Sequence, residues 1–346
     1  AYEISLGLVG SEMCIRDRPV AVDAMRGDYA PEQIIQGAKL AQEFGIPVVL
    51  FGTEEALNGV DEIETKFVSE VIEMDEDAGQ AVRKKKDSSL VRAAEYVRDG
   101  HASAMVSAGN TGATMASALL RMGRLKGVAR PAIATPIPTL EGDHPVILLD
   151  SGANADCQAE WLLQFAEMGA VYARDRFKVQ KPKIGLLSIG EEAGKGNSLV
   201  KEAFKILDSG TWETKSNSEF IGNVEGRDLM GGTVDVVVTD GFTGNVALKT
   251  LEGTAKAIVA ALLTAFTSSD EAKKGSELLA PSLLPLYKKL DPDSVGGAVL
   301  LGIKGIAIVS HGSSSSTAIY NAIKTANELF QDNHVANLQT VMKPLD

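Results

Sequence analysis

Four short apolar runs in this chain each lead into a glycine-rich turn that carries an asparagine. Each run is about as long as a β-strand, is rich in Val, Ile and Leu, and lacks a regular polar alternation. Strands have this composition when they lie in a parallel sheet that is covered on both faces. A helix-like segment follows each turn, so the pattern predicts an α/β fold. The four runs with their turns occupy residues 105–112, 147–154, 184–197 and 236–245.

These turns are expected to lie together at the carboxyl ends of the strands, where open α/β sheets bind ligands. Glycine lets backbone N–H groups approach an anion closely, and the N-terminus of the following helix favours negative charge. The pattern therefore predicts a site that holds a phosphate-like anion beside a carbonyl-like group. Any single turn of this kind is also compatible with the ordinary turn role of Gly and Asn.

The composition is typical of a globular protein and argues against several classes of partner. The chain has 346 residues, 45% of them hydrophobic, and its formal net charge of −12 disfavours nucleic acid as a partner. Its two cysteines, Cys14 and Cys157, form neither a disulfide framework nor a metal-binding motif, and we predict no metal and no cofactor. No apolar stretch is long and clean enough to span a bilayer, so we expect a cytoplasmic protein.

The order of the predicted elements indicates a single α/β domain over residues 19–335. Residues 1–18 do not fit this pattern, and they are too short for a secretory signal, whose basic residues would also precede the apolar part. We interpret them as a foreign or mistranslated extension or a disordered tail. Residues 54–78 are acidic and irregular and are predicted to form an edge. Further strands are expected near residues 20–24, 47–51 and 306–309, and helices near 31–43, 88–99, 159–175, 199–207 and 246–266.

Residues 262–293 depart from the sheet pattern and are predicted to form a protruding helical hairpin. The segment is rich in leucine, is interrupted by Pro281 and Pro285, and has lysines at both ends. An apolar face of this kind has to be covered. A second copy of the chain in a homodimer is one expected partner, and a membrane surface is the other, because basic flanks suit anionic head groups.

Two turns carry candidate catalytic groups. Lys195 and Asn197 lie in a glycine-rich turn that resembles a phosphate-binding P-loop, but the spacing is one residue short and Gly196 stands where Ser or Thr would bind magnesium. A lysine between glycines can still stabilise a developing negative charge. In the other turn, His311 and Gly312 precede a run of serines that would begin a helix and could bind an oxyanion.

At these turns the chain resembles the PlsX family, the phosphate:acyl-carrier-protein acyltransferases of bacterial phospholipid synthesis. The resemblance implies a three-layer αβα fold with a mostly parallel, Rossmann-like sheet, similar to phosphate acetyltransferases and isopropylmalate dehydrogenases. The matching segments are collinear and cover about residues 20–330: 21–25, 107–113, 130–132, 150–154, 220–225, 235–245, 296–298 and 311–313.

The resemblance also implies a reaction and its participants. Inorganic phosphate attacks the thioester of a long-chain fatty acyl group on acyl carrier protein, which gives an acyl phosphate and free carrier without a covalent enzyme intermediate. A membrane glycerol-3-phosphate acyltransferase consumes the product, so a peripheral membrane location is expected. Phosphate is itself a nucleophile, and the site has only to hold two anions close together and stabilise the oxyanion.

Site residues are assigned on this basis. Lys195 and Asn197 are expected to counter negative charge, and His311 either protonates the leaving thiolate or caps a turn. Asp23 ends a strand and is expected to organise its loop at the phosphate site. The phosphate- and substrate-binding set is Asp23, Gly109, Asn110, Thr111, Gly112, Asn154, Asn245, Gly312, Ser313 and Ser314.

The acidic carrier protein requires a local basic patch on a chain that is acidic overall. Two basic runs are candidates, although a solvated helix face explains either one equally well. The first run is Arg83, Lys84, Lys85 and Lys86, and the second is Arg121, Arg124, Lys126 and Arg130.

Arg26 departs from the family pattern, which has glycine at this position of the first loop. If that loop lines the site, a bulky cation there is expected to obstruct it. Two other functions stay open: a phosphate acetyl- or butyryltransferase that uses acyl-coenzyme A, and a non-catalytic scaffold that brings carrier protein to the membrane. A dehydrogenase is disfavoured because neither a metal-binding carboxylate set nor a nucleotide loop is present.

Overall fold

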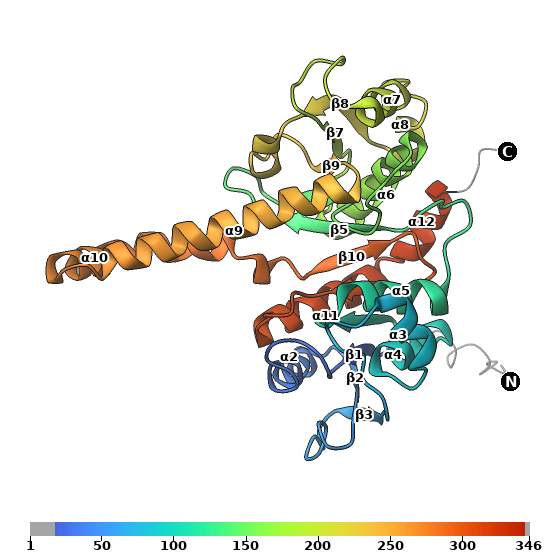
Figure 1. Cartoon of the computed structure of the whole chain (residues 1–346), viewed down its shortest axis with the longest axis vertical. Coiled ribbons are helices and arrows are strands. Elements are labelled where there is room, and N and C mark those ends of the chain that lie inside the picture. Colours follow the sequence, from blue (N-terminus) through green and yellow to red (C-terminus); the bar gives the residue numbers. More distant parts are fainter. Residues whose placement is uncertain (1–17, 343–346) are drawn as a thin grey trace, which may run out of the picture. The chain divides into compact units, whose positions relative to one another are not determined.

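The computed structural model describes residues 18–342, which form two compact units (Figure 1). Unit 1 contains residues up to Pro131 together with the segment from Gly296 onward, and unit 2 contains residues Ala132–Val295. The sequence predicted one domain over residues 19–335, whereas the structure groups these residues around two sets of strands. The predicted extension at residues 1–18 lies outside the described residues, apart from Arg18.

Unit 1 is built on six strands, five of which are parallel. The central strands carry only buried residues, which explains why they read as continuous apolar runs. The sixth strand, β10, is antiparallel to its neighbour β11. The predicted edge at residues 54–78 contains the short edge strand β3. The strand order is β3 (Glu64–Phe67), β2 (Val48–Gly52), β1 (Val20–Asp23), β4 (Ala104–Ser107), β11 (Ala307–Val309) and β10 (Ala298–Leu301).

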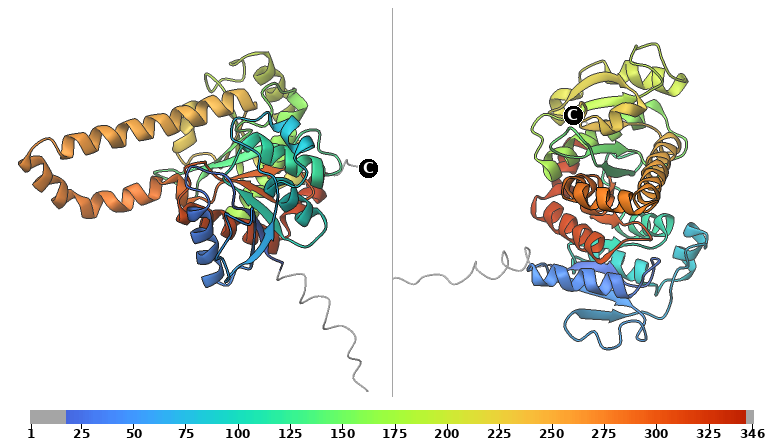
Figure 2. Two further views of the ribbon diagram at one scale, coloured as in Figure 1. Left: turned by 60° about the horizontal axis from the view of Figure 1, so that its bottom comes forward. Right: turned by 90° about the vertical axis from the view of Figure 1, so that its left-hand side faces the viewer.

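Helices cover the strands of unit 1 in two groups. One group pairs α2 (Glu32–Glu43) with α11 (Ser316–Gln331), and α12 (His334–Met342) contacts α11. The other group consists of α3 (Ala78–Lys84), α4 (Ser89–Arg98) and α5 (Thr111–Met122), with α5 in contact with both of the others. Both groups contact the strands, which gives the predicted αβα layering (Figure 2).

Unit 2 repeats this plan with five strands. The order is β5 (Ala132–Ile137), β6 (Val146–Leu149), β9 (Val236–Val238), β7 (Lys183–Leu187) and β8 (Glu219–Val224). All are parallel except β5, which is antiparallel to β6. One layer contains α6 (Ala159–Phe177), α7 (Ser198–Leu207) and α8 (Glu213–Ser216), and the start of α9 (Gly241–Phe266) packs on the other face with the 3₁₀ turn Gly226–Met230.

The mostly parallel α/β fold that the sequence predicted is therefore confirmed. Three strands were not predicted from the sequence: β5, β8 and β10. Of these, β5 and β10 are the antiparallel strands, and β8 alternates exposed and part-buried residues before its buried end.

The helical hairpin begins earlier than predicted, because α9 starts at Gly241 and α10 (Asp270–Leu290) returns the chain to a short turn at Pro292–Ser294. The expectation that Pro281 and Pro285 interrupt the segment was wrong, since α10 runs through both. Each proline removes one helical N–H donor. No residue of α10 is buried, so the carbonyl groups released in this way are open to water.

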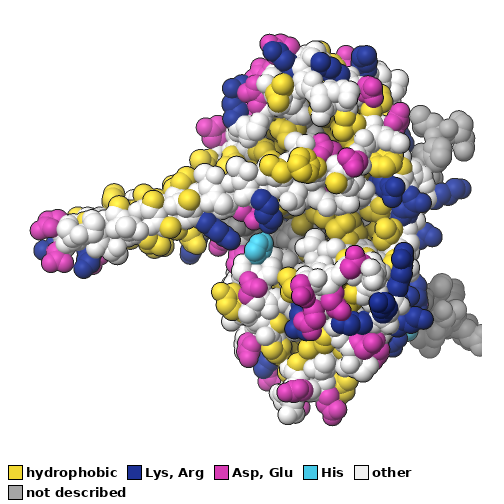
Figure 3. Space-filling view, viewed as in Figure 1, with side chains coloured by type: hydrophobic (Ala, Val, Ile, Leu, Met, Phe, Trp, Pro, Cys, Tyr) yellow, Lys and Arg dark blue, Asp and Glu magenta, His cyan; other side chains and the backbone are white. Residues whose placement is uncertain are grey.

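Side chains along the hairpin are almost entirely exposed, and many of them are apolar (Figure 3). In α9, the buried residues are confined to the first turn, at Gly241 and Gly244. The exposed apolar side chains include Ile258, Val259, Leu262, Leu263, Leu278, Leu279, Leu284, Leu286 and Tyr287, which are 36–83% exposed.

Within residues 18–342, the hairpin helices included, no helix has the combination of length and hydropathy needed to cross a membrane.

Candidate functional site

Three turns of unit 1 lie at one edge of its strands. They follow β1, β4 and β11, which are neighbouring parallel strands, so their carboxyl ends coincide. Contacts between the turns confirm this proximity. Ser107 Oγ donates to Asp23 Oδ2 over 2.8 Å, and the Ser310 amide donates to the Ser107 carbonyl over 2.9 Å. The Asp28 amide donates to the Gly312 carbonyl over 2.7 Å.

Asp23 lies beneath these turns and is almost fully buried. Its Oδ1 accepts a hydrogen bond from the Met25 amide at 3.1 Å, and its Oδ2 accepts the one from Ser107. Burial raises the pKa of Asp23, and hydrogen bonds from Ser89 and Ser107 oppose the rise. The carboxyl group therefore organises the first loop, as its place at a strand end suggested, and does so from below the turn surface.

The turn after β4 presents the N-terminus of α5. Asn110 is the N-cap, with its Oδ1 accepting from the Ala113 amide at 2.9 Å, and the Gly109 amide donates to Ser107 Oγ at 3.0 Å. Thr111 and Gly112 are exposed, and no acidic side chain lies in the first turn. First-turn amides have no acceptor inside a helix, and the helix dipole adds positive potential there. This turn is therefore suited to an exogenous anion.

The turn after β11 is organised differently from the prediction. The helix that follows starts at Ser316 with Ser315 as its N-cap, so Gly312, Ser313 and Ser314 form a separate turn before it. His311 Nδ1 lies 2.8 Å from Ser313 Oγ and accepts from the Ser313 amide at 3.2 Å, while the Ser314 amide donates to the His311 carbonyl. This geometry corresponds to the turn-capping role that the sequence left open for His311.

In unit 2, the turn after β6 is built around Asp150, which is completely buried. Its Oδ1 accepts from the amides of Ile133, Gly152 and Ala153 at 2.9–3.2 Å. Its Oδ2 accepts from both the backbone amide and the side-chain amide of Asn154, at 2.8 and 2.9 Å. The turn thus holds a carboxyl group of the chain at its centre.

The turn after β9 is tied to the same loop. The Gly241 amide donates to the Asn154 carbonyl over 2.7 Å, and Asn245 Nδ2 donates to the Ser151 carbonyl over 3.2 Å. The Asn154 carbonyl and the Asn245 side-chain amide therefore hold the two loops together. Asp240 caps α9 through the Thr243 amide at 2.8 Å.

The turn after β7 carries Lys195, whose side chain is exposed and makes no ion pair within residues 18–342. Its stem lies against Gly190, since a Cβ placed there would be 3.0 Å from Lys195 Cγ. Gly196 has a φ of +96°, which glycine adopts without strain. Asn197 is the N-cap of α7 and accepts from the Val200 amide at 2.9 Å.

Two polar side chains beside this turn were missed by the sequence analysis. Asn223, at the end of β8, donates through Nδ2 to the Glu192 carbonyl at 2.8 Å, and its buried Oδ1 has no partner within the described residues. The buried Ser188 Oγ also lacks one. Asn223 lies inside a segment that carries the family resemblance, which was the available signal. Unpaired buried polar atoms next to a free lysine mark this turn as a candidate reaction centre.

The predicted site residues thus fall into two sets, one in each unit. Unit 1 brings together Asp23, residues 109–112 and residues 311–314, and unit 2 brings together Asn154, Asn245, Lys195 and Asn197 at the ends of neighbouring strands. Across residues 18–342, His, Cys, Asp and Glu side chains form no group suited to a metal ion.

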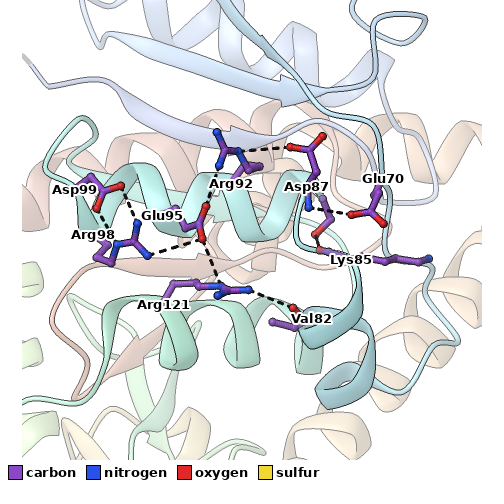
Figure 4. A network of polar contacts seen from close by, with 10 residues as sticks. Glu70, Val82, Lys85, Asp87, Arg92, Glu95, Arg98, Asp99 and Arg121 are labelled. Atoms are coloured by element: carbon purple, nitrogen blue, oxygen red, sulfur yellow. Dashed lines mark hydrogen bonds and ion pairs between the residues drawn. The ribbon is translucent and has the colours of Figure 1, made fainter.

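The predicted carrier-binding residues differ in their availability, and Figure 4 shows two of them, Lys85 and Arg121. Lys85 Nζ contacts Glu76 at 2.6 Å and the Val71 carbonyl at 2.7 Å. Arg121 contacts the Val82 carbonyl and Glu95, and Arg124 contacts the Ala129 carbonyl. Arg83 and Lys84 lie exposed in the last turn of α3, and Lys86 is exposed just beyond it. The available cations are therefore those at the end of α3 and Lys126, which is exposed and bonds to Gln339 only through its backbone.

Comparison with known proteins places this geometry in a family. The family described as "Fatty acid synthesis protein" matches residues 19–337. A phosphate acyltransferase of Elusimicrobium minutum is 47% identical over 330 residues, which cover 92% of this chain and 94% of the relative. A phosphate acyltransferase of Leptospira biflexa is 48% identical over 320 residues, which cover 89% of this chain and 92% of the relative.

Among solved structures, a phosphotransacetylase from Staphylococcus aureus superposes with a TM-score of 0.59. It is 17% identical, and the match covers 90% of this chain and 94% of that one, so the likeness concerns the fold. With nearly the whole chain matched by the family and by relatives of almost half identical sequence, the chain belongs to the fatty acid synthesis protein family, the PlsX phosphate acyltransferases, and is an acyltransferase.

Proposed function

We propose that this chain transfers a long-chain fatty acyl group from acyl carrier protein to inorganic phosphate. Family membership supports acyl transfer that involves phosphate. The observation that carries the phosphate half of the proposal is the first turn of α5. It is exposed, lacks an acidic side chain and follows the glycine-rich turn at the edge where three strands of unit 1 end.

The proposed reaction needs no nucleophile from the chain. A phosphate oxygen attacks the thioester carbonyl carbon and gives a tetrahedral oxyanion, after which the C–S bond breaks and the thiolate takes the phosphate proton. Burial raises the pKa of the Cys157 thiol to about 11, so this cysteine is a protonated, unreactive thiol at neutral pH. Lys195 is available to stabilise the oxyanion or the thiolate.

One contact favours a covalent alternative, namely the Ser313 hydroxyl beside His311 Nδ1. A serine next to an imidazole has the arrangement of an activated nucleophile. The two residues are only two positions apart and close a turn through the Ser313 amide as well, which is a structural function. Direct attack predicts that Ser313→Ala keeps turnover within about tenfold, since no bond to the enzyme forms. A loss of many thousandfold would favour the acyl-serine route.

A long acyl group is supported by apolar surface at the same edge of unit 2. Ile189 follows β7 and Phe242 lies in the first turn of α9, and both are well exposed. Because β7 and β9 are neighbouring strands, these side chains end up beside the turn that carries Lys195. Exposed apolar groups at a site are suited to a hydrocarbon ligand.

The partners follow from charge and exposed apolar surface. We assign the acidic carrier protein to the cations at the end of α3, Arg83, Lys84 and Lys86. The hairpin of α9 and α10 offers its apolar side chains to a second copy of the chain in a homodimer, and its lysines to a membrane surface. A cytoplasmic, peripherally membrane-associated enzyme would release acyl phosphate next to the membrane glycerol-3-phosphate acyltransferase that consumes it.

The deciding experiment is incubation of the purified chain with palmitoyl-acyl carrier protein, with and without inorganic phosphate. Phosphate-dependent appearance of both acyl phosphate and free thiol is the expected result. Lys195→Ala should then lower kcat by about 100-fold to 1,000-fold, as the loss of one oxyanion-stabilising donor does, with Lys201→Ala on the exposed surface of α7 as the matched control. Turnover of acyl-coenzyme A alone would favour the acetyl- or butyryltransferase alternative, and no turnover of either would favour the scaffold.

A further inference from the structure

Arg26 lies directly on the phosphate-binding turn of unit 1. It follows β1, and a Cβ placed on Gly109 would be 3.0 Å from Arg26 Cβ and 3.4 Å from Asp23 Oδ2. The side chain of Arg26 therefore starts next to Gly109, which lies just before the first turn of α5. The sequence predicted that a bulky cation at this position would obstruct the site.

The guanidinium group is held by an acid of the chain. Arg26 Nη2 forms an ion pair with Glu73 Oε1, while the buried Arg26 Nε has no partner within the described residues. The two side chains are 30% and 50% exposed, so the pair is open to solvent. Guanidinium has five N–H donors arranged to grip carboxylate or phosphate with two parallel bonds. Arg26 thus has donors left for a second or a replacing anion.

Glu73 belongs to an acidic segment that contacts all three turns. We call residues 72–77 the acidic strap; Ile72 is buried and the next five residues include four acids. Glu73 reaches Arg26 after β1, and Asn110 Nδ2, after β4, donates to the Met74 carbonyl at 2.8 Å. After β11, a Cβ placed on Gly312 would be 3.8 Å from Met74 Cε.

The acidic strap lies against the edge of unit 1 that is suited to anions. The strap supplies the Glu73 carboxylate to the guanidinium group of Arg26. The Lys85 hydrogen bond lowers the pKa of Glu76, a second acid of the strap, and the charge of Arg26 adds a small effect in the same direction. A further polar group at this edge, Ser310, is only 5% exposed and its hydroxyl has no partner within the described residues. Unpaired buried groups of this kind need a water or a ligand.

We propose that Arg26 is a phosphate-binding residue of this chain and that Glu73 occupies its guanidinium group until phosphate displaces it. The inference rests on the proposed function and assigns Arg26 the opposite role to obstruction. Phosphate and the Glu73 carboxylate then compete for the same donors of Arg26. Neutralising Arg26 should therefore raise the KM for phosphate, whereas neutralising Glu73 should lower it.

The test compares Arg26→Gln, Arg26→Lys and Glu73→Gln with the unaltered chain, and uses Arg98→Gln as the matched control. Arg98 also pairs with a carboxylate of unit 1, Asp99, on the exposed end of α4 (Figure 4). Arg26→Gln is expected to raise the KM for phosphate about tenfold or more, the effect of losing a hydrogen bond to a charged group. The KM for the acyl donor should stay unchanged. The KM for phosphate of Arg26→Lys should lie between those of Arg26→Gln and the unaltered chain, because lysine keeps the charge and loses the paired donors.

Glu73→Gln should lower the KM for phosphate by up to about fivefold, since an exposed ion pair contributes up to about 1 kcal/mol. An Arg26→Gln variant whose KM for phosphate is unchanged or lower would overturn the inference while leaving the proposed function intact.

Binding of radiolabelled inorganic phosphate in equilibrium dialysis, with no acyl donor present, separates the two ideas. If the chain shows no turnover, weaker phosphate binding by Arg26→Gln than by the unaltered chain still supports the inference, and equal binding by the two overturns it. Thermal unfolding of every variant shows whether the fold is kept, and a destabilised Arg26→Gln would leave Arg26→Lys to decide.

Discussion

The turns after β4 and β6 have similar sequences and opposite chemistry. Both follow a buried apolar strand, and both combine small residues, glycine and asparagine. After β4, the first turn of α5 faces solvent without an acid. After β6, the backbone amides point at the buried Asp150. One turn is suited to an anion from solution, and the other already contains an acidic side chain of the chain itself.

The difference arises from where the acidic residue stands. In the β4 turn the strand ends in Ser107, a neutral hydroxyl that is shared between Gly109 and Asp23. In the β6 turn Asp150 takes that place and accepts the amides directly. Glycine-rich turns that gather amide donors bind whichever acceptor is nearest, so a single side chain decides between a structural loop and a ligand site.

The largest expected effect is the loss of the internal acid in Asp150→Ala. This substitution leaves the amides of Ile133, Gly152 and Ala153 without the carboxylate that accepts from them inside a buried loop centre, so the free energy of unfolding should fall by about 3–5 kcal/mol. Urea unfolding measures it, with Asp208→Ala at the exposed end of α7 as the control. A decrease in the free energy of unfolding below about 1 kcal/mol would mean that Asp150 is not needed to hold the β6 turn, and would contradict the contrast between the two turns.

The second prediction gives the β4 turn an acid of its own. Thr111→Asp places a carboxylate at the exposed start of α5, where it should compete with phosphate and raise the KM for phosphate about tenfold, equivalent to about 1.4 kcal/mol. The same charge should leave the fold intact or stabilise it slightly, which thermal unfolding can establish. Phosphate kinetics that do not respond to Thr111→Asp would place the anion elsewhere.

The third prediction separates capping from catalysis. Asn110 and Asn197 are both N-caps, so Asn→Ala at either position should lower the free energy of unfolding by about 1 kcal/mol. Asn110 also holds the acidic strap through the Met74 carbonyl, so only Asn110→Ala should alter the KM for phosphate. Equal kinetic effects of the two substitutions would contradict this assignment.

The smallest effect concerns pH. Because burial raises the pKa of Asp23 in the folded state, the protonated acid is favoured by folding. Its contribution to stability is present below the unfolded pKa and is lost as pH rises through the folded value. Asp23→Asn removes this dependence, so the stability of the unaltered chain relative to the variant should decline with rising pH. Urea unfolding at a series of pH values measures the slope, and a rising difference would contradict the assignment.

Much of the fold was predictable from local patterns. The buried parallel strands β1, β4, β6 and β9 have continuous apolar sequences, which is the pattern that predicted them. The antiparallel strands β5 and β10 were not predictable, because neither is followed by a glycine-rich turn and a helix. The continuity of α10 through Pro281 and Pro285 was also beyond local rules, since it depends on how much of the helix faces water.

The sequence by itself determined the α/β class, the family and the position of the glycine-rich turns, because strand periodicity and turn residues are local properties of the chain. Tertiary structure decided which turn is open to an anion and which is filled by Asp150. It also decided that the Asn154 carbonyl and the Asn245 side chain join two loops, and that Glu73 meets Arg26 across 47 positions of sequence. The sequence identifies the hydrogen-bond donors, but the acceptor that each donor meets is fixed only when distant segments pack together.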